Sequence, residues 1–168
     1  MATGLGASPA PANTDASVQR LRAQHIVTAG ASWFLWIAGL SVVNSAIGLG
    51  GGNLHFIVGL GITQVVDAIA RGAGSAGVVL DLIINGIVAG VFVLLWHFGR
   101  KGQKWAFVLG MALYAADGLL LLAFKDIFSV AFHGYALFRI YNGFKALPAL
   151  QIMETASAQW SGAPIQPR

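Results

Sequence analysis

Two side chains that can share a proton lie on either side of a short turn in the second half of the chain. Asp117 precedes the turn at Lys125 and Asp126, and His133 follows it at a similar distance. If both flanking segments are helices of one hairpin, the carboxylate and the imidazole lie at the same depth and can form a hydrogen bond or an ion pair. Such a pair can move protons, bind a cation or act as general acid and base.

More polar side chains are expected at the same level, on the other apolar segments. Asp81 and Asn85 are four residues apart and therefore lie on one face of a helix. Asn44 lies toward the end of an earlier apolar segment, and Gln64 and Asp67 belong to an amphipathic segment that can cover the same end. The predicted polar cluster consists of Asn44, Asp81, Asn85, Asp117 and His133, with Gln64 and Asp67 as an outer cap.

This cluster has a structural and a functional interpretation. A charged side chain in hydrocarbon costs about 2.5–3.5 kcal/mol on insertion scales, so the aspartates and the histidine should face one another rather than lipid. As structural contacts they join helices, each polar contact adding roughly 0.6–2 kcal/mol. As functional groups they handle a proton or an ion. The structural interpretation is favoured, and no residue is assigned as catalytic.

Metal and haem sites are less favoured alternatives. Asp81, Asp117 and His133 are ordinary oxygen and nitrogen ligands, but no motif such as His-Glu-x-x-His supports a metal centre. His25 and His97 are both expected near one membrane face. Paired histidines there can ligate haem, but histidines at a membrane face are more often simply solvated. No cofactor is therefore assigned.

The composition indicates an integral membrane protein. Of the 168 residues, 57% are hydrophobic and 10% are charged, whereas a soluble domain carries roughly 25% charged residues. Cysteine is absent, which excludes disulfides, thiolate nucleophiles and cysteine-ligated clusters. The formal net charge of +4 comes from basic residues beside apolar segments, so it indicates orientation in a membrane rather than nucleic-acid binding.

The apolar segments predict an all-α membrane protein, a four-helix transmembrane bundle with an extra amphipathic or re-entrant helix between its first two spans. That extra segment can also be read as a short fifth span. The transmembrane domain covers residues 25–148, between a flexible tail at 1–24 and a second tail at 149–168. Its expected spans are residues 26–49, 78–98, 105–124 and 127–147, and the amphipathic segment is 54–70.

Basic residues and glycines complete the expected arrangement. With four spans and an internal N-terminus, most Lys and Arg side chains are cytoplasmic, as the positive-inside rule requires, and both termini lie in the cytoplasm. Gly86 and Gly90 form a Gly-x-x-x-Gly motif for helix packing, on a face that points away from Asp81 and can meet another helix or another protomer.

Four stretches carry a resemblance to small, uncharacterised bacterial four-span integral membrane proteins. They are Trp33 to Ser41, Phe56 to Gln64, Tyr114 to Leu119, and Phe132 with His133. The resemblance implies a bacterial cytoplasmic (inner) membrane and supplies no activity.

Three functions follow, in order of preference. The first is a non-catalytic accessory or scaffold subunit that packs against other membrane subunits or against itself in the lipid bilayer. It is favoured because the chain is small and carries no nucleophile elbow or phosphate loop. The second is a proton- or cation-coupled transporter or channel that uses the intramembrane Asp and His side chains. The third is a membrane-embedded enzyme acting on a lipid or quinone.

Overall fold

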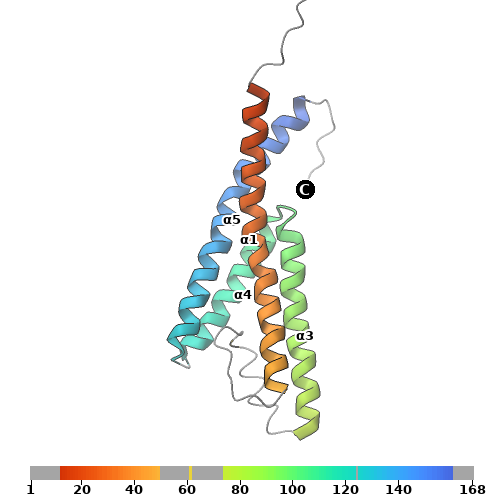
Figure 1. Cartoon of the computed structure of the whole chain (residues 1–168), viewed down its shortest axis with the longest axis vertical. Coiled ribbons are helices and arrows are strands. Elements are labelled where there is room, and N and C mark those ends of the chain that lie inside the picture. Colours follow the sequence, from red (N-terminus) through yellow and green to blue (C-terminus); the bar gives the residue numbers. More distant parts are fainter. Residues whose placement is uncertain (1–11, 50–60, 62–73, 124, 161–168) are drawn as a thin grey trace, which may run out of the picture.

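The computed structural model describes residues 12–49, 61, 74–123 and 125–160, and in these parts of the chain all regular structure is helical. The long helices are α1 (Ala12–Leu49), α3 (Gly74–Gly99), α4 (Lys104–Ala123) and α5 (Ile127–Trp160), labelled as in Figure 1. A short loop joins α3 to α4, and a tight turn joins α4 to α5. The prediction of an all-helical protein is confirmed for these residues.

Among the described residues, α1, α3 and α4 each contain a stretch long and apolar enough to cross a membrane. The stretches are Asp15–Ile47, Leu82–Gly99 and Lys104–Ala123. At 1.5 Å per residue, the 20 residues of α4 span about 30 Å, the thickness of a hydrocarbon core. The chain is thus a membrane protein with transmembrane helices. α5 is long enough, with 34 residues, but His133, Arg139 and Asn142 interrupt its apolar run.

The N-terminal helix begins earlier than the sequence predicts. A tail was expected over residues 1–24, whereas α1 is already helical at Ala12. Gln19, Arg20, Leu21 and Arg22 are good helix formers, and Asp15 in the first turn interacts favourably with the helix dipole. Because these residues continue a helix already formed by the apolar span, they need no nucleus of their own.

The C-terminal helix also continues past its predicted end. A tail was expected from residue 149, yet α5 passes through Pro148 and ends at Trp160. Proline removes one intrahelical hydrogen bond, the one to the carbonyl four residues earlier. Leu147 and Leu150 are both buried on either side of Pro148, so packing holds the helix together across it.

Helix α1 packs against both α3 and α5, and α4 packs against α5. The closest approach of α1 and α5 is at Gly30 and Gly143. A Cβ atom on Gly30 would lie 2.6 Å from Gly143 Cα, so the two backbones are in direct contact. Away from the loop between α3 and α4, the α1/α3 pair and the α4/α5 pair diverge (Figure 1).

Aromatic rings fill the space between α1, α3 and α4. The buried ring of Phe34 lies 5.9 Å from that of Phe107 and 6.3 Å from that of Phe92, centroid to centroid. Gly110 on α4 makes this possible, because a Cβ there would overlap the Phe34 ring. The core is therefore tightest toward the end that carries the loop between α3 and α4.

The predicted packing glycines have no close neighbour within the described part of the chain. Gly86 and Gly90 are exposed on α3, and no described atom lies within 4 Å of the position a Cβ would take on either residue. Close helix packing occurs instead at Gly30 and Gly143, which are too far apart in sequence to form a local motif. Packing of the α3 glycines against a second chain remains a prediction.

Candidate functional site

The turn between α4 and α5 sets the register of the two side chains that can share a proton. Lys125 adopts a left-handed conformation, with φ of 61°. Asp126 then caps α5: its Oδ1 accepts the Ser129 backbone N–H at 3.2 Å, and its Oδ2 accepts the Ser129 hydroxyl at 2.6 Å. These bonds hold the start of α5 at a defined position beside the end of α4.

Asp117 and His133 meet across this hairpin. The His133 Nε2 atom lies 2.9 Å from Asp117 Oδ2, a hydrogen-bond distance. The side chains are 2% exposed for His133 and 6% for Asp117, so the pair is removed from both solvent and lipid. Two helices thus meet through a polar contact inside an otherwise apolar bundle.

The Ser129 carbonyl determines where hydrogen sits on the His133 ring. Its oxygen lies 2.8 Å from His133 Nδ1, and because a carbonyl can only accept, Nδ1 must carry the hydrogen. A hydrogen bond between Nε2 and Asp117 Oδ2 then requires one further proton between these two atoms. The pair is either imidazolium with carboxylate or neutral imidazole with carboxylic acid, and its net charge is zero in both arrangements.

A backbone amide from a distant part of the chain completes the site. The Gly61 N–H donates to Asp117 Oδ2 at 2.8 Å. A side chain at Gly61 would not fit, because a Cβ there would lie 2.9 Å from Leu121 Cγ and 3.1 Å from the Asp117 carbonyl oxygen. Asp117 Oδ2 therefore hydrogen-bonds to both the Gly61 N–H and His133 Nε2, which joins three parts of the chain at one oxygen.

Two residues of α4 shape the space around the imidazole. The Tyr114 ring stacks on the His133 ring, with centroids 4.1 Å apart and an interplanar angle of 14°. Gly118 leaves room on the same helix, because a Cβ there would lie 3.3 Å from His133 Cβ. The imidazole is thus held by stacking and by hydrogen bonds at both nitrogens.

The other predicted site residues are placed less completely. Asn85 is buried on α3 and Asn44 is half-buried on α1. Asp81 lies on α3, and its side chain is outside the described part of the structure, as are Gln64 and Asp67. The prediction of a cluster drawn from all spans therefore stays a prediction, and the described part that comes together is Asp117 with His133.

Sequence reasoning missed two contributors to the site. Ser129 acts through its carbonyl and its cap, neither of which has a sequence signature. Gly61 had a weak signal, since Gly59-Leu60-Gly61 in an apolar context can indicate close backbone approach. Ser41 and Ser45, which take no part in the described contact, are buried one turn apart on α1, and their hydroxyls have no hydrogen-bond partner among the described residues.

The geometry limits what the site can do chemically. Both ring nitrogens of His133 are engaged, so neither has a lone pair directed at an open ligand position. Among the described residues, no group of three His, Cys, Asp or Glu side chains is arranged to hold a metal ion. The pair can hold one proton in two positions and can join helices. No protein-family model matches the chain, and neither a curated protein nor a solved structure shows significant similarity to it.

Proposed function

We propose that this chain is a non-catalytic integral membrane protein that works as an accessory or scaffold subunit of a larger membrane assembly. The assembly consists of other membrane proteins or of further copies of the chain. The observation that carries the proposal is the saturated state of the buried pair. His133 is hydrogen-bonded at both nitrogens, and Asp117 Oδ2 takes part in two hydrogen bonds.

A saturated pair is what a helix-joining contact requires. A nucleophile, general base or metal ligand must offer a lone pair toward a space that a substrate can reach. Here the two groups are turned toward each other and toward backbone atoms, and both are nearly completely buried. Removing one partner would leave the other buried in an apolar interior without a hydrogen-bond partner, which costs free energy. Only the helix arrangement that keeps the two groups in contact avoids this cost, so the contact specifies that arrangement.

The proposal includes a fourth crossing by α5. Arg139 is the main obstacle, since it is exposed midway along this helix. Its guanidinium lies 5.7 Å from the Trp33 ring centroid and 6.0 Å from that of Tyr135, and it donates to the Tyr135 hydroxyl at 3.3 Å. These contacts partly replace water around the charge, while the long side chain reaches toward the headgroups.

Orientation follows from the distribution of basic residues. With four crossings, both termini and the loop between α3 and α4 lie on one side. That side carries Arg20, Arg22, Arg100, Lys101 and Lys104. The positive-inside rule then makes it cytoplasmic, and the bacterial inner membrane is the membrane proposed.

The exposed face of α3 is the surface proposed to meet a partner. Ile83 and Ile87 are more than half exposed there, and Gly86 and Gly90 allow another helix to come close. The test is the assembly state of the full chain in lipid nanodiscs or mild detergent, measured by light scattering and by cross-linking in native membranes. We expect a complex larger than one chain.

Matched substitutions connect that complex to the α3 face. Gly86→Leu and Gly90→Leu should dissociate the complex without loss of helical content. Gly39→Leu is the control and should leave the complex intact, since Gly39 is an exposed glycine of α1 with no described atom within 4 Å of its Cβ position. A lone monomer in every condition, with no copurifying protein, would contradict the proposal.

A proton- or cation-coupled transporter is the second candidate, favoured by one observation. The Asp117–His133 pair holds a single proton that either group can carry, which is what a proton-transfer step needs. This function predicts ion flux in proteoliposomes that Asp117→Asn abolishes while the helical content is retained. Flux equal to that of protein-free liposomes rules it out.

A further inference from the structure

A pocket of mixed polar and apolar lining lies at the end of the bundle that carries the loop between α3 and α4. Its volume is about 300 Å³, at the lower limit of small-molecule sites. The loop forms one part of its wall, and α1 and α5 both continue past the loop (Figure 1). The lining side chains include Gln24 of α1, Arg100, Lys101 and Gln103 of the loop, and Leu150 and Glu154 of α5.

The loop part of this pocket is held in a defined shape. Backbone hydrogen bonds join Lys101 N to Phe98 O at 3.1 Å and Gly102 N to Gly99 O at 2.9 Å. Gly102 has φ of 77°, a conformation that favours glycine. The Gln151 amide donates to the Gly102 carbonyl at 3.4 Å and so links the loop to α5. The pocket is therefore preorganised.

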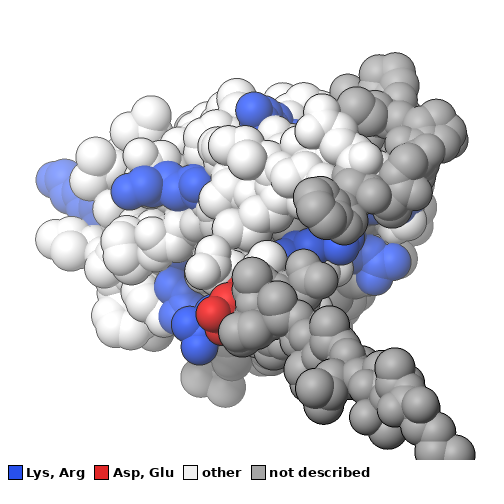
Figure 2. Space-filling view, turned by 90° about the horizontal axis from the view of Figure 1, so that it is seen from above, with Lys and Arg blue, Asp and Glu red and all other residues white. Residues whose placement is uncertain are grey.

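The charge of the pocket favours an anion. Arg100 and Lys101 supply two positive charges against the one carboxylate of Glu154, and Gln24 and Gln103 supply amide donors. Arg20 and Arg22 follow on the adjoining part of α1. In the view from above, far more basic than acidic surface is visible (Figure 2).

The depth of the pocket matches that of lipid headgroups. The loop joins α3 and α4, two helices able to cross a membrane, so it lies where hydrocarbon gives way to headgroups. Trp105 is about half exposed at the start of α4, and the Arg100 guanidinium lies 4.6 Å from the centroid of the Trp96 ring. Tryptophan is enriched at this level of membrane proteins.

We propose that this pocket binds the phosphate-bearing headgroup of an anionic phospholipid. Arg100 and Lys101 contact the phosphate oxygens, and the glutamine amides add hydrogen bonds. Two cations against one carboxylate disfavour a zwitterionic headgroup such as phosphatidylcholine. This site is independent of the Asp117–His133 pair and of the function proposed above.

The test uses the purified full-length chain in a neutral detergent, with short-chain phosphatidylglycerol or phosphatidylcholine as the added lipid. Binding is measured by native mass spectrometry and by the shift in melting temperature. Phosphatidylglycerol should bind at least tenfold more tightly than phosphatidylcholine. Arg100→Gln and Lys101→Gln should each weaken phosphatidylglycerol binding about fivefold, the contribution of one basic residue near an anionic surface.

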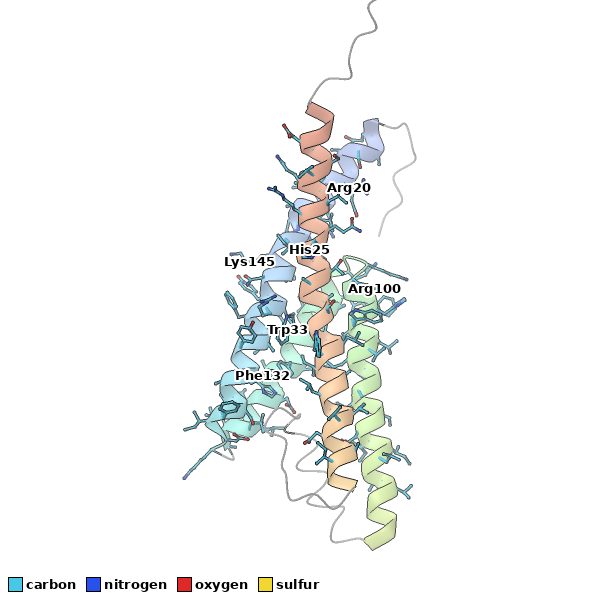
Figure 3. All side chains as sticks on the ribbon, in the orientation of Figure 1. Arg20, His25, Trp33, Arg100, Phe132 and Lys145 are labelled. Atoms are coloured by element: carbon cyan, nitrogen blue, oxygen red, sulfur yellow. The ribbon has the colours of Figure 1, made fainter. Side chains whose placement is uncertain are left out.

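Lys145→Gln is the matched control. This cation lies over the Tyr141 ring, at 5.7 Å from its centroid, and is well separated from Arg100 in Figure 3. It should change the affinity less than twofold, and all variants should keep the helical content and the lipid-free melting temperature of the parent.

Three outcomes overturn the proposal. The first is equal binding of the two lipids, and the second is a loss of affinity in Lys145→Gln as large as in Arg100→Gln. In the third, inorganic phosphate binds with the same dependence on Arg100 and displaces the lipid at equal concentration, which makes a soluble phosphate compound the ligand.

Discussion

The contact between Gly30 and Gly143 predicts a large effect from the smallest possible substitution. In Gly30→Ala, the new Cβ would lie 2.6 Å from Gly143 Cα and 3.0 Å from Gly143 N. Carbon atoms that are not bonded pack at about 3.5–4.0 Å, so α1 and α5 must move apart by about 1 Å. Both opposing atoms belong to the backbone, and no side-chain rotation can relieve the overlap.

Gly39→Ala provides the reference for this measurement. Gly39 lies in the same helix, and no described atom lies within 4 Å of its Cβ position. Both substitutions gain the same intrinsic helix propensity, about 1 kcal/mol, so this gain cancels when the variants are compared. The remaining difference is the cost of overpacking. We expect Gly30→Ala to be about 1–3 kcal/mol less stable than Gly39→Ala.

The assay is reversible unfolding of the full chain in mixed micelles, as the fraction of denaturing detergent is increased. Fluorescence of the five tryptophans reports tertiary packing, and circular dichroism reports helix content. Gly143→Ala should lose a similar amount, and the double variant less than the sum, because the helices have already separated. Equal stability of Gly30→Ala and Gly39→Ala would refute a backbone contact between α1 and α5.

Three further predictions use the same unfolding assay. Asp117→Asn should lower the free energy of unfolding by about 1–3 kcal/mol, because the amide atom that replaces Oδ2 cannot both accept the Gly61 N–H and donate to His133 Nε2. An unchanged unfolding midpoint would contradict this prediction. Gly110→Ala should lower the free energy of unfolding by about 1–3 kcal/mol, because the new Cβ overlaps the Phe34 ring. Adding Phe34→Leu should recover part of this loss, and a further loss would show that Gly110 does not make room for Phe34. Gly102→Ala should cost about 1–2 kcal/mol because its φ is 77°, while Gly134→Ala, at a helical position with open space, should cost nothing; equal effects would show that the loop tolerates a side chain.

The coarse fold could be predicted because it depends on patterns within short segments. Composition and apolar run length identify membrane helices, and Lys125-Asp126 marks the turn between α4 and α5. The spacing of Asp117 and His133 from that turn places them at one depth, which is where the structure has them in contact. A hairpin permits this inference, since its two arms are joined by so few residues.

Features that depend on distant segments could not be predicted in this way. Nothing near Gly30 indicates that Gly143 lies against it, and Gly86 with Gly90 has the more familiar spacing yet no neighbour among the described residues. The Gly61 amide reaches Asp117 through tertiary structure alone. The end of α5 was predicted wrongly for a related reason. Local propensity ends a helix at Pro148, whereas buried residues on both sides of the proline keep α5 helical.

The Ser129 carbonyl has an electrical consequence for the hairpin as a whole. With hydrogen on Nδ1, the hydrogen bond between Nε2 and Asp117 Oδ2 requires one shared proton, and a pair with that proton has no net charge whichever group holds it. A membrane potential does work of about 2.3 kcal/mol per elementary charge per 100 mV, and a neutral pair experiences almost none of it. If α5 crosses the membrane as proposed, a change in potential does not drive the polar centre of the α4–α5 hairpin toward either face.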